Sequence, residues 1–182
     1  MDIQHYLYHF AHLHTAKFKG KPAPHKAVLL LAVMNLVGRG SIKTSEIELT
    51  DELVEEFKRI WAEKLPSSCP FTCDISKPFF HMQHEPFWRL VEHDENYWMV
   101  AEELGLYAEE KKTMAKGYSI AAMREKFRCA KIDGDLFEIF HNAEWCKEME
   151  NLLVMKYMDY EPPLNRRISM SAIVGMALCI VA

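Results

Sequence analysis

The feature that most constrains the fold of this chain is a run of apolar side chains over residues 27–37, AVLLLAVMNLV, in which Asn35 is the one polar residue. A helix at a protein surface shows a single apolar stripe, whereas a helix that is apolar nearly all round has to be buried. Pro24 favours a helix start at His25, because its fixed φ suits the first turn and its missing N–H costs nothing there. The glycines within residues 38–40 favour the helix end. We therefore predict a central buried helix.

Apolar residues at helical spacing predict further helices, and Thr50 and Asn142 are placed to cap two of them. Aromatic and β-branched residues at 87–91 and 97–100, on either side of a polar turn, predict a β-hairpin. The fold class is therefore α+β and mainly helical, with about six helices and one small antiparallel hairpin or sheet, similar to a winged helix. Besides the central helix, the expected helical ranges are 2–14, 50–65, 119–130, 133–141 and 143–158.

The length of 182 residues fits a single domain, which we expect to span residues 1–160. Residues 161–182 form an apolar C-terminal segment. Its last part, 168–182, carries no charge and is shorter than the roughly 20 residues that a helix needs to span a bilayer, so we expect no membrane association. The segment is either a packed element of the fold or a truncated junction to a missing domain.

Charge and cysteine content narrow the class of protein. Lys and Arg number 22 against 26 for Asp and Glu, and this net charge of −4 argues against a chain that binds nucleic acid by being basic throughout. Residues 1–40, however, hold five basic residues and one acid, so a polyanion would bind there. The five cysteines lack disulfide-framework spacing, and residues 1–4 do not resemble a signal peptide, so we expect reduced thiols and a cytoplasmic location.

One group of histidines allows a metal-binding alternative. His5, His9 and His12 are spaced to share one helix face, and imidazoles at such a spacing can bind zinc. A solvated polar face explains the same spacing equally well. No carboxylate or cysteine ligand follows at a suitable interval, and we expect neither a metal nor another cofactor.

Two other patterns invite a catalytic or zinc interpretation. Cys69 and Cys73 precede His81 and His84, but the spacing is unusual for zinc, and buried or half-buried thiols are the simpler interpretation. The charged run at 109–112 matches the short half of a metal-dependent nuclease motif, although such runs are usually solvated surface. The sequence holds no nucleotide-binding or serine-hydrolase motif, so we predict no catalytic residue.

The basic residues near the start of the central helix are better candidates for a binding site. Lys17, Lys19, Lys21 and Lys26, together with His25, surround a point where unpaired backbone N–H groups and the helix dipole favour an anion. Lysines on a loop would add long-range attraction to a phosphate backbone. A solvated loop that only keeps the protein in solution is the alternative.

Four short motifs together carry a resemblance to a known family. They are KPAPHKAVLLLA at 21–32, SKPFFHM at 76–82, PFWRL at 86–90 and AKIDGDLF at 130–137. In this order and spacing, they resemble the sulfur-binding domain of bacterial type IV restriction endonucleases, and the likeness covers roughly residues 5–158. Those enzymes cut phosphorothioate-modified DNA, and in them this domain usually precedes an HNH nuclease domain.

The resemblance implies roles for particular residues. His25 and Lys26 occupy the position of the family's pair that contacts the modified backbone, and Pro78 matches the proline that lines the sulfur pocket. The residue before this proline is aromatic in the best-known members and the residue three after it is small, whereas this chain has Lys77 and His81 there. Arg89 and Arg124 are the candidates for a further arginine that clamps the DNA in the family.

We therefore expect a non-catalytic module that recognises phosphorothioated double-stranded DNA in a restriction or phage-defence system. A nuclease domain or subunit would supply the cleavage, and the sequence also allows a homodimer. Two alternatives stay open. One is a metal-dependent nuclease in its own right, with Glu110 as the first acid to test, and the other is a protein-interaction scaffold without DNA binding.

Overall fold

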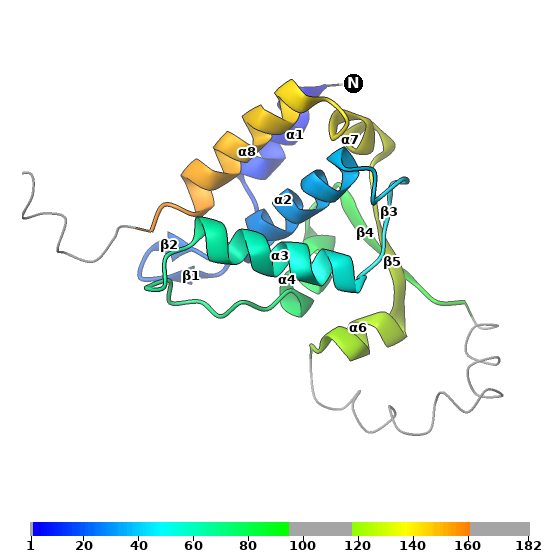
Figure 1. Ribbon diagram of the computed structural model, residues 1–182, viewed down its shortest axis with the longest axis horizontal. Helices are drawn as coiled ribbons and strands as arrows, with labels where there is room; N and C mark the ends of the chain where they lie inside the picture. The colour runs from blue at the N-terminus through cyan, green and yellow to red at the C-terminus, as the bar shows by residue number, and fades with distance from the viewer. Residues whose placement is uncertain (1, 95–117, 161–182) are drawn as a thin grey trace, which may run out of the picture.

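The computed structural model describes residues 2–94 and 118–160, which form an α+β fold that is mainly helical (Figure 1). This confirms the predicted fold class. The helices of the described part are α1 (Ile3–Ala11), α2 (His25–Gly38), α3 (Asp51–Lys64), α4 (Ser76–His81), the 3₁₀ turn η1 (Met82–His84), α6 (Ile120–Lys126), α7 (Gly134–Ile139) and α8 (Ala143–Tyr157). The strands are β1 (Lys17–Phe18), β2 (Lys21–Pro22), β3 (Glu46–Ile47), β4 (Trp88–Glu92) and β5 (Phe127–Ile132).

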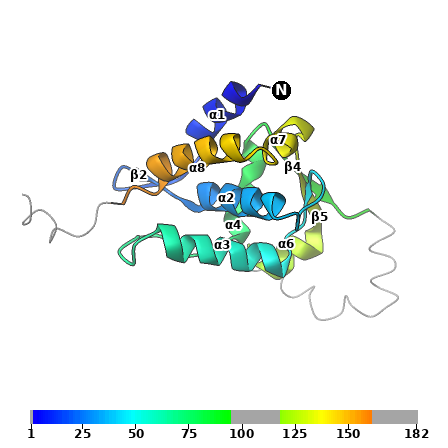
Figure 2. The same ribbon diagram turned by 45° about the horizontal axis from the view of Figure 1, so that its top comes forward.

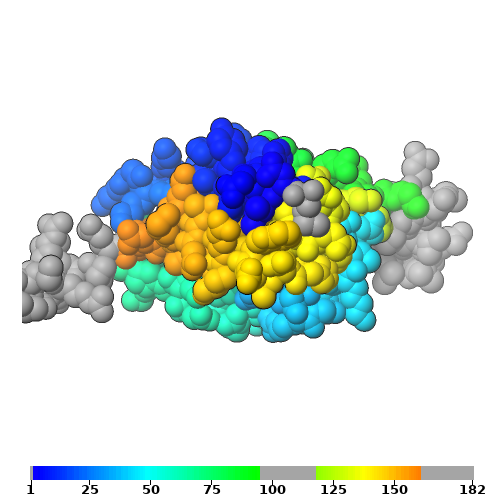
Figure 3. Space-filling model, turned by 90° about the horizontal axis from the view of Figure 1, so that it is seen from above, coloured from blue at the N-terminus to red at the C-terminus, as the bar shows by residue number. Residues whose placement is uncertain are grey.

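Helix α2 is the central buried helix that its composition predicts. It runs between α8 and α3 in both ribbon views (Figures 1 and 2), and it also contacts α4. All of its residues from Lys26 to Val37 except Asn35 are buried. Helix α1 lies across α8 on the outside of this layer (Figure 3). A helix that is apolar on every side is therefore covered on every side, as burial of its surface requires.

The caps expected at two helices are present. The Thr50 hydroxyl accepts a hydrogen bond from the backbone N–H of Leu53 at 3.2 Å, which starts α3. The Asn142 side chain accepts from the N–H groups of Glu144 and Trp145, which starts α8. Such side chains satisfy N–H groups that have no partner within the helix. The expected helices at 2–14, 50–65, 133–141 and 143–158 thus correspond to α1, α3, α7 and α8.

The strands differ most from what the sequence predicts. Strand β5 lies between β3 and β4 in a three-stranded antiparallel sheet, with Ile132 opposite Trp88. The helix expected at 119–130 is wrong over its last four residues, because α6 ends at Lys126 and the chain continues as β5. Four of the six residues of Phe127–Ile132 are buried, and pairing with the two neighbouring strands fixes the segment as a strand. In the described part, β4 pairs with β5, while residues 97–100 of the expected hairpin lie outside it.

The segment expected to be a basic loop contains a short hairpin. Strands β1 and β2 pair antiparallel, with Phe18 opposite Lys21. Lys19 and Gly20 have φ values of 49° and 82°, as the two central residues of a type I′ turn require. A positive φ is easy for glycine and costly for lysine. The described part therefore holds two small sheets where the sequence indicates one.

Two further expectations concern the ends of the domain. None of the helices in residues 2–94 and 118–160 is both long and apolar enough to cross a membrane. The charged run at 109–112, with Glu110, and the apolar segment at 161–182 both lie outside the described residues. The domain boundary at residue 160 stays a prediction.

Candidate functional site

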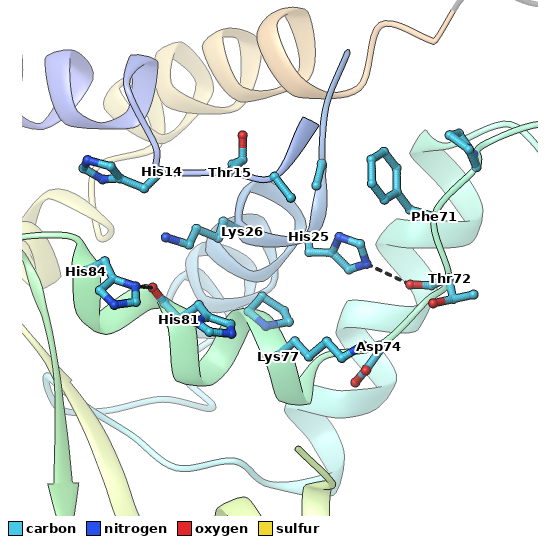
Figure 4. A pocket seen from close by; sticks show the side chains of 14 residues that line it. His14, Thr15, His25, Lys26, Phe71, Thr72, Asp74, Lys77, His81 and His84 are labelled. Atoms are coloured by element: carbon cyan, nitrogen blue, oxygen red, sulfur yellow. Dashed lines mark hydrogen bonds between the residues drawn. The ribbon is translucent and has the colours of Figure 1, made fainter. Parts of the chain in front are cut away.

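A cavity of about 580 Å³ opens at the N-terminal end of α2 (Figure 4). Its walls come from four places: the segment before β1, the start of α2, the loop before α4, and α4 with η1. Segments far apart in the chain meet here because α4 packs against α2. The lining residues are His14, Thr15, Ala16, Ala23, His25, Lys26, Pro70, Phe71, Thr72, Asp74, Lys77, Pro78, His81 and His84.

The cavity brings together residues from two separate sequence motifs. His25 and Lys26 are the first two residues of α2, and Lys77, Pro78 and His81 belong to α4. All five line the same cavity (Figure 4). The sequence resemblance assigns the first pair to the DNA backbone and the other three to a sulfur pocket. The fold makes them neighbours across some fifty residues of chain.

Lys26 is held differently from the free loop lysine that the sequence suggests. Its side chain is 6% exposed, and its ammonium donates to a carboxylate oxygen of Glu85, whose side chain is 1% exposed. A buried charge of either sign needs such a partner. The lysine nevertheless lines the cavity, and an ammonium has three donors, so Glu85 fixes its position without using all of its hydrogen-bonding capacity.

Glu85 also holds the segment before β1. The backbone N–H of His14 donates to Oε1 of Glu85 at 2.9 Å, and Nδ1 of His14 lies 3.3 Å from Oε2. One carboxylate therefore positions both the segment before β1 and the start of α2. The sequence alone does not reveal this role, because no spacing or motif distinguishes Glu85 from an ordinary surface acid one residue before the PFWRL motif.

His25 presents an aromatic surface to the cavity. Its Nε2 lies 2.8 Å from the carbonyl oxygen of Thr72, an acceptor, so Nε2 carries the proton. Its ring centroid lies 4.8 Å from that of Trp61 and 5.6 Å from that of Phe71. Burial lowers the pKa of His25, and the hydrogen bond to Thr72 opposes that shift only in part. The ring is therefore neutral at pH 7.

The α4 side of the cavity carries a second pair of histidines. The rings of His81 and His84 stack with centroids 5.7 Å apart, and the His81 carbonyl lies 3.1 Å from Nδ1 of His84. Burial lowers the pKa of His81, and the nearby charges of His84, Lys26 and Lys77 lower it further. These groups repel one another when charged, and a bound anion would relieve that repulsion.

The lining combines cationic hydrogen-bond donors with apolar surface. Asp74 is the one acid among the lining residues, and its Oδ1 already accepts from the backbone N–H and the hydroxyl of Ser76. Pro78 stands in the first turn of α4, where a proline is tolerated, and it is buried. The ring of Phe71 adds a further apolar surface. Cationic groups and apolar rings thus share one cavity.

The remaining basic candidates do not line the cavity. Lys17 and Lys19 are exposed on the hairpin, while Lys21 donates to the carbonyl oxygen of Asp159 at 2.9 Å. Arg89 is exposed on β4. Arg124 donates to the backbone carbonyl of Leu49 and to Asp51, so it ties α6 to the start of α3.

The zinc alternatives receive no geometric support. Within residues 2–94 and 118–160, no three side chains of His, Cys, Asp or Glu converge in a way that could hold a metal ion. His5 and His9 contact each other edge to face, and Nδ1 of His12 lies 2.7 Å from the carbonyl oxygen of Tyr8. Cys69 is half-buried and Cys73 exposed, both as free thiols.

No family model matches the sequence. No curated protein matches it either.

Proposed function

We propose that this chain is a non-catalytic module that binds the backbone of double-stranded DNA at the cavity between α2 and α4 and prefers a phosphorothioate there. In this proposal, cleavage belongs to a separate nuclease domain or subunit of a restriction or phage-defence system. The observation that carries the proposal is that His25 and Lys26 from one motif, and Lys77, Pro78 and His81 from another, line one cavity.

The electrostatics of the cavity support a backbone phosphate as the ligand. A phosphodiester carries one negative charge, and Lys26 and Lys77 can both donate to its oxygens. The first N–H groups of α2 lie at the same place, and α2 has no side-chain cap and no acid in its first turn. A phosphate could therefore accept hydrogen bonds both from these side chains and from the backbone.

The apolar side of the cavity supports a preference for sulfur. Sulfur in place of a non-bridging oxygen gives a larger, softer and more weakly hydrated atom. An oxygen placed against the Pro78 ring would lose its water without gaining a hydrogen bond, and that desolvation costs free energy. Sulfur loses less hydration at the same place, so the ring discriminates between the two atoms.

Pro78 offers the sharpest test of this function. Binding of a short duplex with a single phosphorothioate, taken as separated diastereomers, is compared with binding of the all-oxygen duplex for wild type and Pro78→Ala. Two methylene contacts of the proline ring are lost in the variant, so the sulfur preference should fall by up to about tenfold. Pro66→Ala, in the loop after α3 and outside the cavity, is the matched control and should keep the wild-type ratio.

Lys77 tests the backbone part of the function separately. It is exposed at the rim of the cavity, so Lys77→Ala should fold normally. We expect both duplexes to bind more weakly to this variant and the salt dependence to become shallower by about one phosphate contact. Unchanged affinity for both duplexes in Pro78→Ala and Lys77→Ala would contradict DNA binding at this cavity.

A further inference from the structure

The β1–β2 hairpin is a basic arm at the edge of the cavity. Lys17 and Lys19 are exposed, and no acidic residue occurs in the sequence between Asp2 and Glu46. The hairpin begins directly after Ala16 and ends directly before Ala23, and both of these alanines line the cavity. A ligand in the cavity therefore lies at the base of the arm.

The arm is fixed to the body of the protein. The ammonium of Lys21 donates to the carbonyl oxygen of Asp159, and the Tyr160 hydroxyl donates to the carbonyl oxygen of Pro22 at 2.8 Å. The backbone N–H of Ala23 donates to the carbonyl oxygen of Ala16 at 2.7 Å and closes the base of the hairpin. In Figure 3 the arm lies against the C-terminal end of α8. It is therefore a preorganised element.

Phe18 is the unusual side chain of this arm. It is 47% exposed, although removing a phenylalanine side chain from water is favourable. Its ring contacts Phe71 edge to face, with centroids 6.3 Å apart, and Phe71 lines the cavity. The ammonium of Lys19 lies 5.5 Å from the centre of the Phe18 ring. This surface suits a nucleic acid, because exposed lysines can bind phosphates and an apolar ring between them can contact bases.

We propose that the β1–β2 hairpin enters the major groove of the same duplex whose phosphate occupies the cavity, with the Phe18 ring against the base edges. This inference rests on the proposed function and extends it from the backbone to the bases. A two-stranded ribbon with strands about 4.8 Å apart fits a major groove about 12 Å wide. The apolar groups that a phenylalanine can contact in this groove are thymine methyls.

The length of the arm limits which bases Phe18 can reach. Phe18 lies two residues beyond Ala16, which at about 3.3 Å per residue is about 7 Å from the edge of the cavity. Successive nucleotides of one strand are about 3.4 Å apart along the duplex axis. Phe18 should therefore contact bases within about two base pairs of the bound phosphate.

A panel of duplexes tests this placement. Each duplex carries one phosphorothioate, and the base pairs within two steps on either side are varied, including thymine to uracil, which removes only the methyl group. Wild type should bind the panel with a spread in Kd of about fivefold or more, and Phe18→Ala should reduce that spread to below about twofold. The ratio between phosphorothioate and all-oxygen duplexes should stay unchanged in Phe18→Ala, because that ratio depends on the cavity.

Tyr8→Ala is the matched control, since Tyr8 is a 62% exposed aromatic residue on α1 that does not line the cavity. It should keep the wild-type spread. A full spread in Phe18→Ala, or no spread in wild type, would overturn the inference and leave the proposed function standing. Failure of wild type to bind any duplex of the panel would overturn both.

Photo-cross-linking provides a second readout that does not depend on affinity. A duplex with 5-iodouracil one or two base pairs from the phosphorothioate is irradiated in the complex, and the cross-linked peptide is identified by mass spectrometry. The inference predicts a cross-link at Phe18. Cross-links confined to other elements would contradict it.

Discussion

The ammonium of Lys26 and the carboxylate of Glu85 form a buried ion pair, 2.5 Å between Nζ and Oε1, that joins the start of α2 to the residue after η1. The same carboxylate accepts from the backbone N–H of His14. Three segments that line the candidate site are thus tied to one side chain, and the site and the stability of the fold depend on the same contact.

This ion pair predicts a strong coupling between two substitutions. Lys26→Met leaves a buried carboxylate without its cation, and Glu85→Gln leaves a buried ammonium without its anion, so each should lower the free energy of unfolding by about 3–5 kcal/mol. The double variant removes both charges and keeps an acceptor for the His14 N–H. It should cost clearly less than the sum of the two, as measured by urea denaturation. Additive losses would show that the two charges do not stabilise each other.

The cavity histidines predict that acid strengthens DNA binding. The pKa of His81 is lowered in the free protein by burial and by neighbouring charges, and a bound phosphate would raise it. The complex then binds more protons than the free protein, so affinity should rise about threefold to tenfold as pH falls from about 7.5 to about 5.5. Kd measured against pH for His81→Gln with His84→Gln should be flatter than for wild type. His5→Gln with His12→Gln, two exposed histidines in and directly after α1, should keep the wild-type profile.

The same acid range should weaken the free fold. The pKa of His25 is lowered by burial, so the unfolded chain binds a proton more tightly at this residue than the folded chain does. Acid therefore favours unfolding, and the free energy of unfolding should fall as pH drops below about 6.5. Thermal melts of the free protein across this range measure the effect. A melting temperature that rises with acid while DNA is absent would contradict the buried, neutral state of His25.

The lysines of the β1–β2 hairpin should differ in their roles, with Lys17 and Lys19 contacting DNA and Lys21 holding the hairpin in place. Lys17 and Lys19 are exposed, so Lys17→Ala with Lys19→Ala should leave stability unchanged and make the slope of log K against log salt shallower by up to about 2. Lys21 donates to Asp159 and lies 5.8 Å from the centre of the Tyr160 ring, so Lys21→Ala should loosen the arm. Salt titrations with one phosphorothioate duplex measure the slopes. An unchanged slope in the double variant would contradict contact between the arm and DNA.

The contacts of Glu56 predict how the stability of the fold depends on pH, independently of DNA binding. Its buried carboxylate accepts from Arg59 at 3.0 and 2.8 Å and from Asn35 at 2.9 Å, and it also pairs with Arg39. These contacts, with Arg59 first, lower the pKa of Glu56 to about 2. A depressed carboxyl pKa stabilises the fold above the ordinary value of 4.5 and ceases to do so as pH falls towards 2.

The measurement for Glu56 is urea unfolding at a series of acidic pH values. Wild type should lose about 1–3 kcal/mol between pH 4.5 and pH 2 through this residue, and Glu56→Gln should lose correspondingly less over the same range. Glu55→Gln is the matched control, because Glu55 is an exposed neighbour on α3 that pairs only with Lys58 among the described residues. Equal acid sensitivity of wild type and Glu56→Gln would contradict the assignment.

The sequence predicts those parts of the fold that depend on local pattern. An apolar run without a polar face can only be a buried helix, and caps such as Asn142 mark a helix start by their own hydrogen bonds. Strand β5 could not be predicted in this way, because it is fixed by β3 and β4, which lie roughly eighty and forty residues earlier in the chain. Residues 127–130 alone fit a helix as well as a strand.

In the candidate site, too, local motifs predict some residues, whereas long-range packing determines the rest. Motifs in the sequence distinguish His25, Lys26 and Pro78, but only the packing of α4 on α2 makes them neighbours. Glu85 carries no local signal, since its role comes from partners at positions 14 and 26. No pattern in the sequence distinguishes Phe18, and its place at the edge of the cavity follows from the hairpin and from its contact with Phe71.

The most direct test of the account is a competition titration with the wild-type chain at about 150 mM salt, where weak non-specific attraction is suppressed. A labelled duplex with one phosphorothioate is displaced by the same unlabelled duplex or by its all-oxygen counterpart. The account predicts that the all-oxygen duplex is needed at a concentration at least about tenfold higher. Equal displacement by the two duplexes would contradict sulfur recognition, and a labelled duplex that never binds would contradict DNA binding itself.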